Sequence, residues 1–190
     1  QLAGIISPER IVPAVVEFVD IAGLVAGASK GEGLGNQFLA HIRETDAIVN
    51  VVRCFEDENV IHVAGKVDPI ADIEVIQTEL CLADMGTVEK AQHRFGKAAR
   101  SGTDKEAALL VPLLTKVSSH LDQGKPVRSL DLSKEEQVLL KPLCLITAKP
   151  AMFVANVAED GFSNNPLLDR LTEYANSQNA PVVAICAKIE

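Results

Sequence analysis

A strand, a helix and a second strand follow one another early in the chain, and this order constrains the fold most. Residues 16–20 are a mainly apolar run, residues 35–44 place Phe38 and Ile42 on one side of a helix, and residues 47–52 are continuously apolar. This succession predicts a parallel sheet of the α/β class. The continuous run predicts a strand that is covered on both faces.

The C-terminal part of the chain extends the same pattern. Apolar runs at 152–156 and 181–186 predict two more core strands, and a helix is expected between them over residues 166–177. The fold class is therefore predicted as α/β.

Between these parts lies a long helical stretch. Ile73, Ile76 and Leu80 begin a helical pattern, the sequence at 101–104 interrupts it, and a second run follows with four-three spacing. That second run, typical of a coiled-coil seam, consists of Leu110, Leu114, Val117 and Leu121. We expect an antiparallel helical arm that projects from the sheet.

The predicted arm divides the chain into three parts. Residues 1–68 and 147–190 would form the sheet domain, and residues 69–146 would form the insertion. Within the insertion, Ser133 and Glu136 have the spacing of a capping box and predict the start of a further helix.

Composition excludes several classes of protein. The 190 residues carry a formal net charge of −8, which argues against general coating of nucleic acid and against a DNA partner. No apolar run approaches the length of about 20 residues that a membrane span needs, so no membrane partner is expected. The four cysteines, which contain no CxxC pair, predict reduced core thiols in a cytoplasmic protein: Cys54, Cys81, Cys144 and Cys186.

The first candidate site motif follows the run at 16–20. Asp20 ends this run, Gly23 lies three residues on, and a loop with four glycines continues to Gly35. In P-loop nucleotide hydrolases an Asp-x-x-Gly arrangement of this kind lies at the γ-phosphate. Asp20 is therefore a candidate ligand of Mg²⁺ through a bridging water molecule, and Gly23 is a candidate phosphate contact. A buried strand that ends in an ordinary turn is the alternative.

Two further motifs stand at strand ends. Asn156-Val157-Ala158-Glu159 follows one predicted strand and Cys186-Ala187-Lys188 follows the next, where guanine-nucleotide hydrolases carry Asn-Lys-x-Asp and Ser-Ala-Lys. Three motifs in this order predict a relative of the P-loop GTPases.

Longer strings closely resemble the YchF-type Obg-like ATPase family. They are residues 18–25, 31–36, 43–46, 52–56 and 156–161, and the resemblance covers essentially the whole chain. It implies a Ras-like sheet with a coiled-coil arm, in a cytoplasmic ATP-hydrolysing factor that binds ribosomes and acts in translation and stress responses. Mg²⁺ is the implied cofactor.

The base motif departs from the guanine-specific pattern. Glu159 is one methylene longer than the aspartate that accepts two hydrogen bonds from guanine, so the bidentate fit is lost. Val157 replaces the lysine that lies along the base, and the Ala187 backbone and Asn156 remain. Loss of the guanine clamp follows from the residues, whereas preference for ATP over the weaker ligand GTP is implied by the resemblance. Phe55 is either a base contact or a core residue.

Two other features carry candidate roles. Leu24 stands where Ras-like enzymes place the glutamine that orients water, and the resemblance points to His62 as the catalytic histidine, with a solvent-exposed loop residue as the alternative. Lys90, Arg94 and Lys97 share one helix face, either as a contact for ribosomal RNA or as a solvated surface.

The sequence contains no Gly-x-x-x-x-Gly-Lys-[Ser/Thr] motif, which the family places before the segments seen here. The family's C-terminal TGS domain is absent as well. We therefore expect a fragment that binds nucleotide weakly or not at all by itself, with a gap in the sheet or a partly exposed core. The alternative function is a non-catalytic module that binds protein or RNA through its arm.

Overall fold

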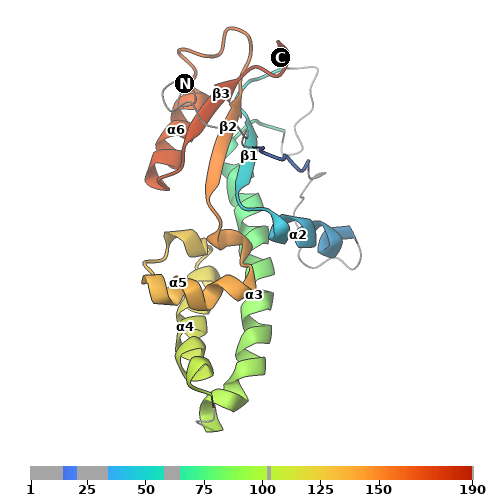
Figure 1. Cartoon of the computed structure of the whole chain (residues 1–190). Coiled ribbons are helices and arrows are strands. Elements are labelled where there is room, and N and C mark those ends of the chain that lie inside the picture. The colour runs from blue at the N-terminus through green and yellow to red at the C-terminus, as the bar shows by residue number, and fades with distance from the viewer. Residues whose placement is uncertain (1–14, 21–33, 58–64, 102–103, 190) are drawn as a thin grey trace, which may run out of the picture.

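The computed structural model describes residues 15–20, 34–57, 65–101 and 104–189 (Figure 1). Its elements, in chain order, are α2 (Leu34–Glu44), β1 (Ile48–Arg53), α3 (Pro69–Ser101), α4 (Lys105–Asp122), η2 (Val127–Ser129), α5 (Lys134–Leu140), η3 (Lys141–Leu143), η4 (Ile146–Ala148), β2 (Ala151–Asn156), α6 (Pro166–Ser177) and β3 (Val182–Ile185).

The three strands form a parallel sheet in the order β1-β2-β3, which confirms the predicted α/β class. Helices α3 and α6 pack on one face of the sheet. The core there is aliphatic around one aromatic pair, since the Phe153 and Tyr174 rings meet edge to face with centroids 5.9 Å apart.

The opposite face of the sheet differs from the prediction. Val49, Val51 and Val183 remain exposed there, with Val51 68% accessible. The expectation that both faces of β1 are covered is therefore wrong for the described residues, because their helices pack on the other face.

The strand predicted at 16–20 is a second correction. Residues 15–20 form neither helix nor strand, and Val16 and Phe18 are 74% and 79% exposed. A strand needs a neighbour that satisfies its backbone N–H and C=O groups. In the described part of the chain, β1 pairs only with β2, so residues 15–20 do not form a ladder with the edge of β1.

The helical arm forms as predicted. Helices α3 and α4 pack against each other and extend away from the sheet (Figure 1). The seam side chains are buried: Leu110 6%, Leu114 0%, Val117 0% and Leu121 2% exposed. The hairpin is therefore held by burial of one apolar stripe from each helix.

The arm shares helix α3 with the sheet domain. Ile73, near the start of α3, belongs to the sheet core, whereas Val88 and Ala91 belong to the arm core. The proposed boundary at residues 68/69 stays a prediction, and the packing places the first turns of the predicted insertion against the sheet.

A buried carboxylate joins the elements at the base of the arm. Asp84 on α3 is fully buried and accepts hydrogen bonds from the Ile146 N–H (2.9 Å), the Thr147 N–H (2.7 Å) and Thr147 Oγ1 (2.7 Å). Arg43 of α2 approaches the same carboxylate at 3.6 Å, and Lys149 Nζ donates to the Arg43 carbonyl at 2.8 Å. These contacts hold α2 and the segment that leads into β2 against α3.

The capping box is confirmed, with Ser133 as the N-cap of α5 and reciprocal hydrogen bonds to Glu136. The cysteine prediction holds for Cys54, Cys81 and Cys186, which are buried free thiols. It is wrong for Cys144, which is exposed because it ends the short η3 turn with a left-handed backbone (φ 47°). None of the helices in the described residues is both long and apolar enough to cross a membrane.

Candidate functional site

The ends of β2 and β3 are joined by the first residue of the predicted base motif. The Ala187 N–H donates to Asn156 Oδ1 over 3.1 Å, and the Val157 N–H donates to the Ile185 carbonyl. Because both strands are parallel, their carboxyl ends meet at one edge, where α/β sheets bind ligands. The Asn156 and Ala187 motifs therefore lie together, as the sequence predicted for a base site.

The loop after β2 carries the carboxylate of the motif. Glu159 Oε1 pairs with Lys188 Nζ at 2.9 Å, and this hydrogen bond raises the pKa of Lys188. Both side chains are exposed, so the pair is weak. The arrangement nevertheless gives the Glu159 carboxylate a cation as its partner.

Val157 lies differently from the other motif residues. Its side chain is 2% exposed and belongs to the sheet core. Its contribution in this structure is to packing beneath the loop, and a base contact through this side chain stays a prediction.

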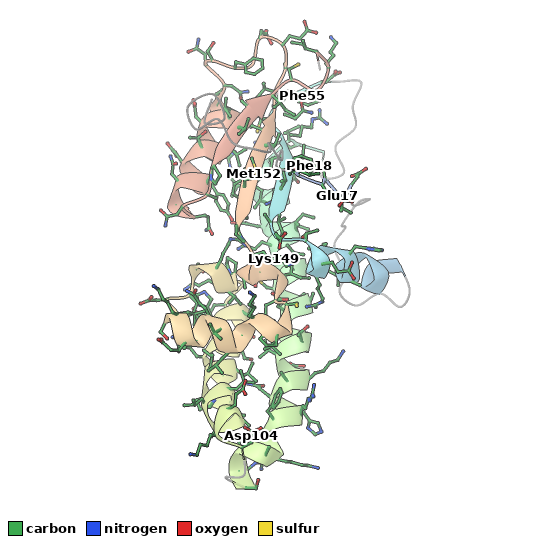
Figure 2. The ribbon with its side chains drawn as sticks, viewed as in Figure 1. Glu17, Phe18, Phe55, Asp104, Lys149 and Met152 are labelled. Carbon is green, nitrogen blue, oxygen red and sulfur yellow. The ribbon has the colours of Figure 1, made fainter. Side chains whose placement is uncertain are left out.

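Phe55 follows β1 at the same end of the sheet (Figure 2). The Arg53 guanidinium lies 4.7 Å from the Phe55 ring centroid, and Arg53 Nε donates to the Phe55 carbonyl over 3.0 Å. A cation over a ring face is attractive, so Arg53 holds Phe55 in place. Sequence reasoning did not identify this role of Arg53.

A second residue that the sequence reasoning missed is Asn165, the N-cap of α6. Its amide bridges the loops after β1 and β2 by donating to the Cys54 carbonyl (2.9 Å) and the Gly161 carbonyl (3.0 Å). Asparagine followed by Pro166 is an N-cap pattern, but nothing local in the sequence indicates the bond to Cys54.

The predicted phosphate end is only partly described. Asp20 is exposed in the segment 15–20, while Gly23 and the proposed catalytic His62 lie outside the described residues. Among the residues that the structure describes, no group of three or more His, Cys, Asp or Glu side chains could hold a metal ion. The assignment of Asp20 as a ligand of Mg²⁺ therefore stays a prediction.

The basic residues of the arm lie on its outer surface. Lys90, Arg94 and Lys97 are exposed on α3, and the Arg94 guanidinium lies 5.2 Å from the Phe95 ring centroid. Spacings of four and three residues place the three cations on one face. The surface therefore presents three positive charges on a chain whose net charge is −8.

Comparison with known proteins gives consistent matches. The family model described as a 50S ribosome-binding GTPase matches residues 6–79. The protein named ribosome-binding ATPase YchF is 55% identical in Escherichia coli O157:H7 and 50% identical in Bacillus subtilis. Each alignment covers 100% of this chain and 52% of the relative.

A solved structure shares the fold. The YchF GTPase of Schizosaccharomyces pombe matches with a TM-score of 0.78 and 35% identity, over 97% of this chain and 51% of that chain. The chain thus spans about half the length of the relatives it matches. Over its whole length, it is a homologue of the YchF-type ribosome-binding ATPases and has the α/β fold of their GTPase relatives.

Proposed function

We propose that this sequence forms the base-recognition end and the helical arm of an ATP-hydrolysing, ribosome-associated factor. The observation that carries the proposal is the hydrogen bond between Asn156 and the Ala187 N–H, which joins two nucleotide motifs at one sheet edge. The names of the relatives, ribosome-binding ATPase, support the same function.

The base end would bind a purine through groups shared by adenine and guanine. Asn156 uses its Oδ1 to accept from the Ala187 N–H, which orients its amide nitrogen as a donor. A donor at this place suits purine N7, an acceptor in both bases. Asn156 therefore supplies affinity without discrimination.

Preference for ATP over GTP would come from Glu159. Guanine presents two adjacent N–H donors to a carboxylate, and a glutamate displaced by one methylene and paired with Lys188 meets them poorly. Adenine does not present this pair of N–H donors, so the position of the Glu159 carboxylate does not weaken its binding. Phe55, held by Arg53, would provide the apolar contact with the ring.

The phosphate end would use Asp20 and Gly23, with Mg²⁺ supplying charge stabilisation when bound and His62 positioning water. This part rests on the sequence motif and the family resemblance.

Titration of the full chain with ATP and GTP tests the base assignment through the ratio of the two affinities, because a chain without a Gly-x-x-x-x-Gly-Lys-[Ser/Thr] motif is expected to bind both nucleotides weakly. The variant Glu159→Asp restores the shorter carboxylate and should raise GTP affinity by about tenfold relative to ATP. Asn156→Ala should weaken both nucleotides, while Asp122→Asn, an exposed acid on the arm, serves as the control. An unchanged ATP-to-GTP ratio in Glu159→Asp would refute the discrimination argument, and binding of neither nucleotide would favour a non-catalytic module.

The arm would contact ribosomal RNA through Lys90, Arg94 and Lys97. Each phosphate contact adds roughly 0.7 to 0.9 to the slope of log affinity against log salt. The triple alanine variant should therefore lower the slope of ribosome binding by about two. The matched control removes three exposed lysines outside that face, Lys66, Lys134 and Lys141. Equal losses in both triple variants would show general charge attraction and no specific surface.

A further inference from the structure

The loops that carry Phe55 and Glu159 are tied together by one side chain. Asn165 Nδ2 donates to the Cys54 carbonyl, directly before Phe55, and to the Gly161 carbonyl, two residues after Glu159. Asn165 Oδ1 accepts from the Leu167 and Leu168 N–H groups at 3.0 and 3.3 Å. All four hydrogen-bonding positions of the amide are used, so its orientation is fixed by its partners.

The loop held by Asn165 has little room to rearrange. The Gly161 N–H donates to the Ala158 carbonyl over 2.9 Å, which closes a tight turn around Glu159. A Cβ at Gly161 would lie 3.0 Å from Ala158 N and 3.3 Å from Asn165 Nδ2. The turn is therefore packed closely against the Asn165 amide.

The other end of the bridge is equally anchored. Cys54 is fully buried, and its N–H donates to the Asn156 carbonyl over 2.8 Å, continuing the ladder between β1 and β2. The Cys54 carbonyl then points to Asn165 and not to a strand. The start of α6 thus locks the turn after β2 to the end of β1.

We propose that Asn165 is a positioning residue that holds the Phe55 and Glu159 loops as one unit for recognition of the nucleotide base. The inference rests on the proposed function, because it assigns the two loops to the base. Asn165 touches no base itself. It sets the separation between the ring that would pack on the base and the carboxylate that would discriminate it.

The alternative is that Asn165 only caps α6, and Asn165→Ser separates the two roles. Serine is an equally good N-cap, but its hydroxyl is too short to reach both carbonyls. Asn165→Asp also keeps the cap acceptor and turns the two donor positions into an oxygen that faces carbonyl oxygens. The matched control is Asp104→Ser, an N-cap of the same geometry on α4 at the far tip of the arm (Figure 2).

The first readout is hydrogen exchange without nucleotide. Asn165→Ser should speed exchange of the Gly161 amide by at least about tenfold, Asn165→Asp should speed it further, and Asp104→Ser should leave it unchanged. Unchanged exchange in both Asn165 variants would overturn the proposal.

The second readout is binding to the full chain. Asn165→Ser should weaken ATP by about tenfold while binding of inorganic triphosphate, which has no base, stays the same. Equal loss of both ligands would indicate a general defect and overturn the proposal, as would faster exchange with unchanged ATP affinity. If the wild-type chain binds no nucleotide, the proposed function fails by itself, and the exchange data still decide whether Asn165 holds the two loops.

Discussion

Removing the buried Asp84 carboxylate should be among the most damaging single changes to the stability of this fold. Asp84 accepts two backbone N–H groups and the Thr147 hydroxyl, and Arg43 lies nearby. In Asp84→Ala, both N–H groups are left without an acceptor in a place that water does not reach. A buried donor without a partner costs about 1 to 3 kcal/mol, so the expected loss in unfolding free energy is about 4 kcal/mol.

Asp84→Asn should fall between wild type and alanine. The amide keeps one oxygen, which serves Thr147 best because that oxygen already accepts two of the hydrogen bonds. The amide nitrogen then faces the Ile146 N–H, so one donor loses its partner and the expected loss is about 2 kcal/mol. Since domains are stable by about 5 to 15 kcal/mol, Asp84→Ala should leave a marginal fold.

Urea unfolding followed by far-ultraviolet circular dichroism suits this measurement, because the chain has no tryptophan. The control Asp122→Asn replaces an exposed aspartate on α4 and should change stability by less than about 0.5 kcal/mol. A loss below about 1 kcal/mol for Asp84→Ala, at an unchanged urea slope, would refute the view that these hydrogen bonds hold the junction.

Three more outcomes are expected. The hydrogen bond from the Ala71 N–H lowers the pKa of Asp68 in the folded state. The stability that this carboxylate contributes is therefore present above its ordinary pKa and is lost as the pH falls through the lowered pKa. In Asp68→Asn, the unfolding free energy should fall less steeply at acid pH than in the wild type. Iodoacetamide should label exposed Cys144 well before Cys54, whose pKa burial raises to about 11, and peptide mass spectrometry would reveal the reverse order. Ser133→Ala should cost about 1 kcal/mol in urea unfolding, and Ser133→Thr far less; equal losses would contradict a role of the hydroxyl as cap.

Features that depend on local chemistry were predictable from the sequence. The start of α6 follows from the Asn165-Pro166 pair, and the Ser133 cap follows from residue spacing alone. The parallel sheet followed from the alternation of strands and helices. Within the site, the meeting of Asn156 and Ala187 followed from their places after adjacent parallel strands.

Features that depend on distant partners were not predictable. Residues 16–20 have strand composition, yet a strand forms only where a neighbour supplies hydrogen bonds. The bond from Asn165 to the Cys54 carbonyl spans 111 positions, and no pattern near either residue indicates it. The exposure of Cys144 depends on the turn geometry of η3, which an apolar neighbourhood does not reveal.

Helix α3 gives the arm a mechanical property. Its 33 residues run without interruption from the sheet core to the arm tip, a length of about 50 Å at 1.5 Å per residue. A rotation of about 5° where Ile73 meets the sheet would move Ser101, about 42 Å farther along the helix, by roughly 3 to 4 Å. Small reorientations of the sheet would thus displace a partner bound to Lys90, Arg94 and Lys97 by a distance comparable to a hydrogen-bond length.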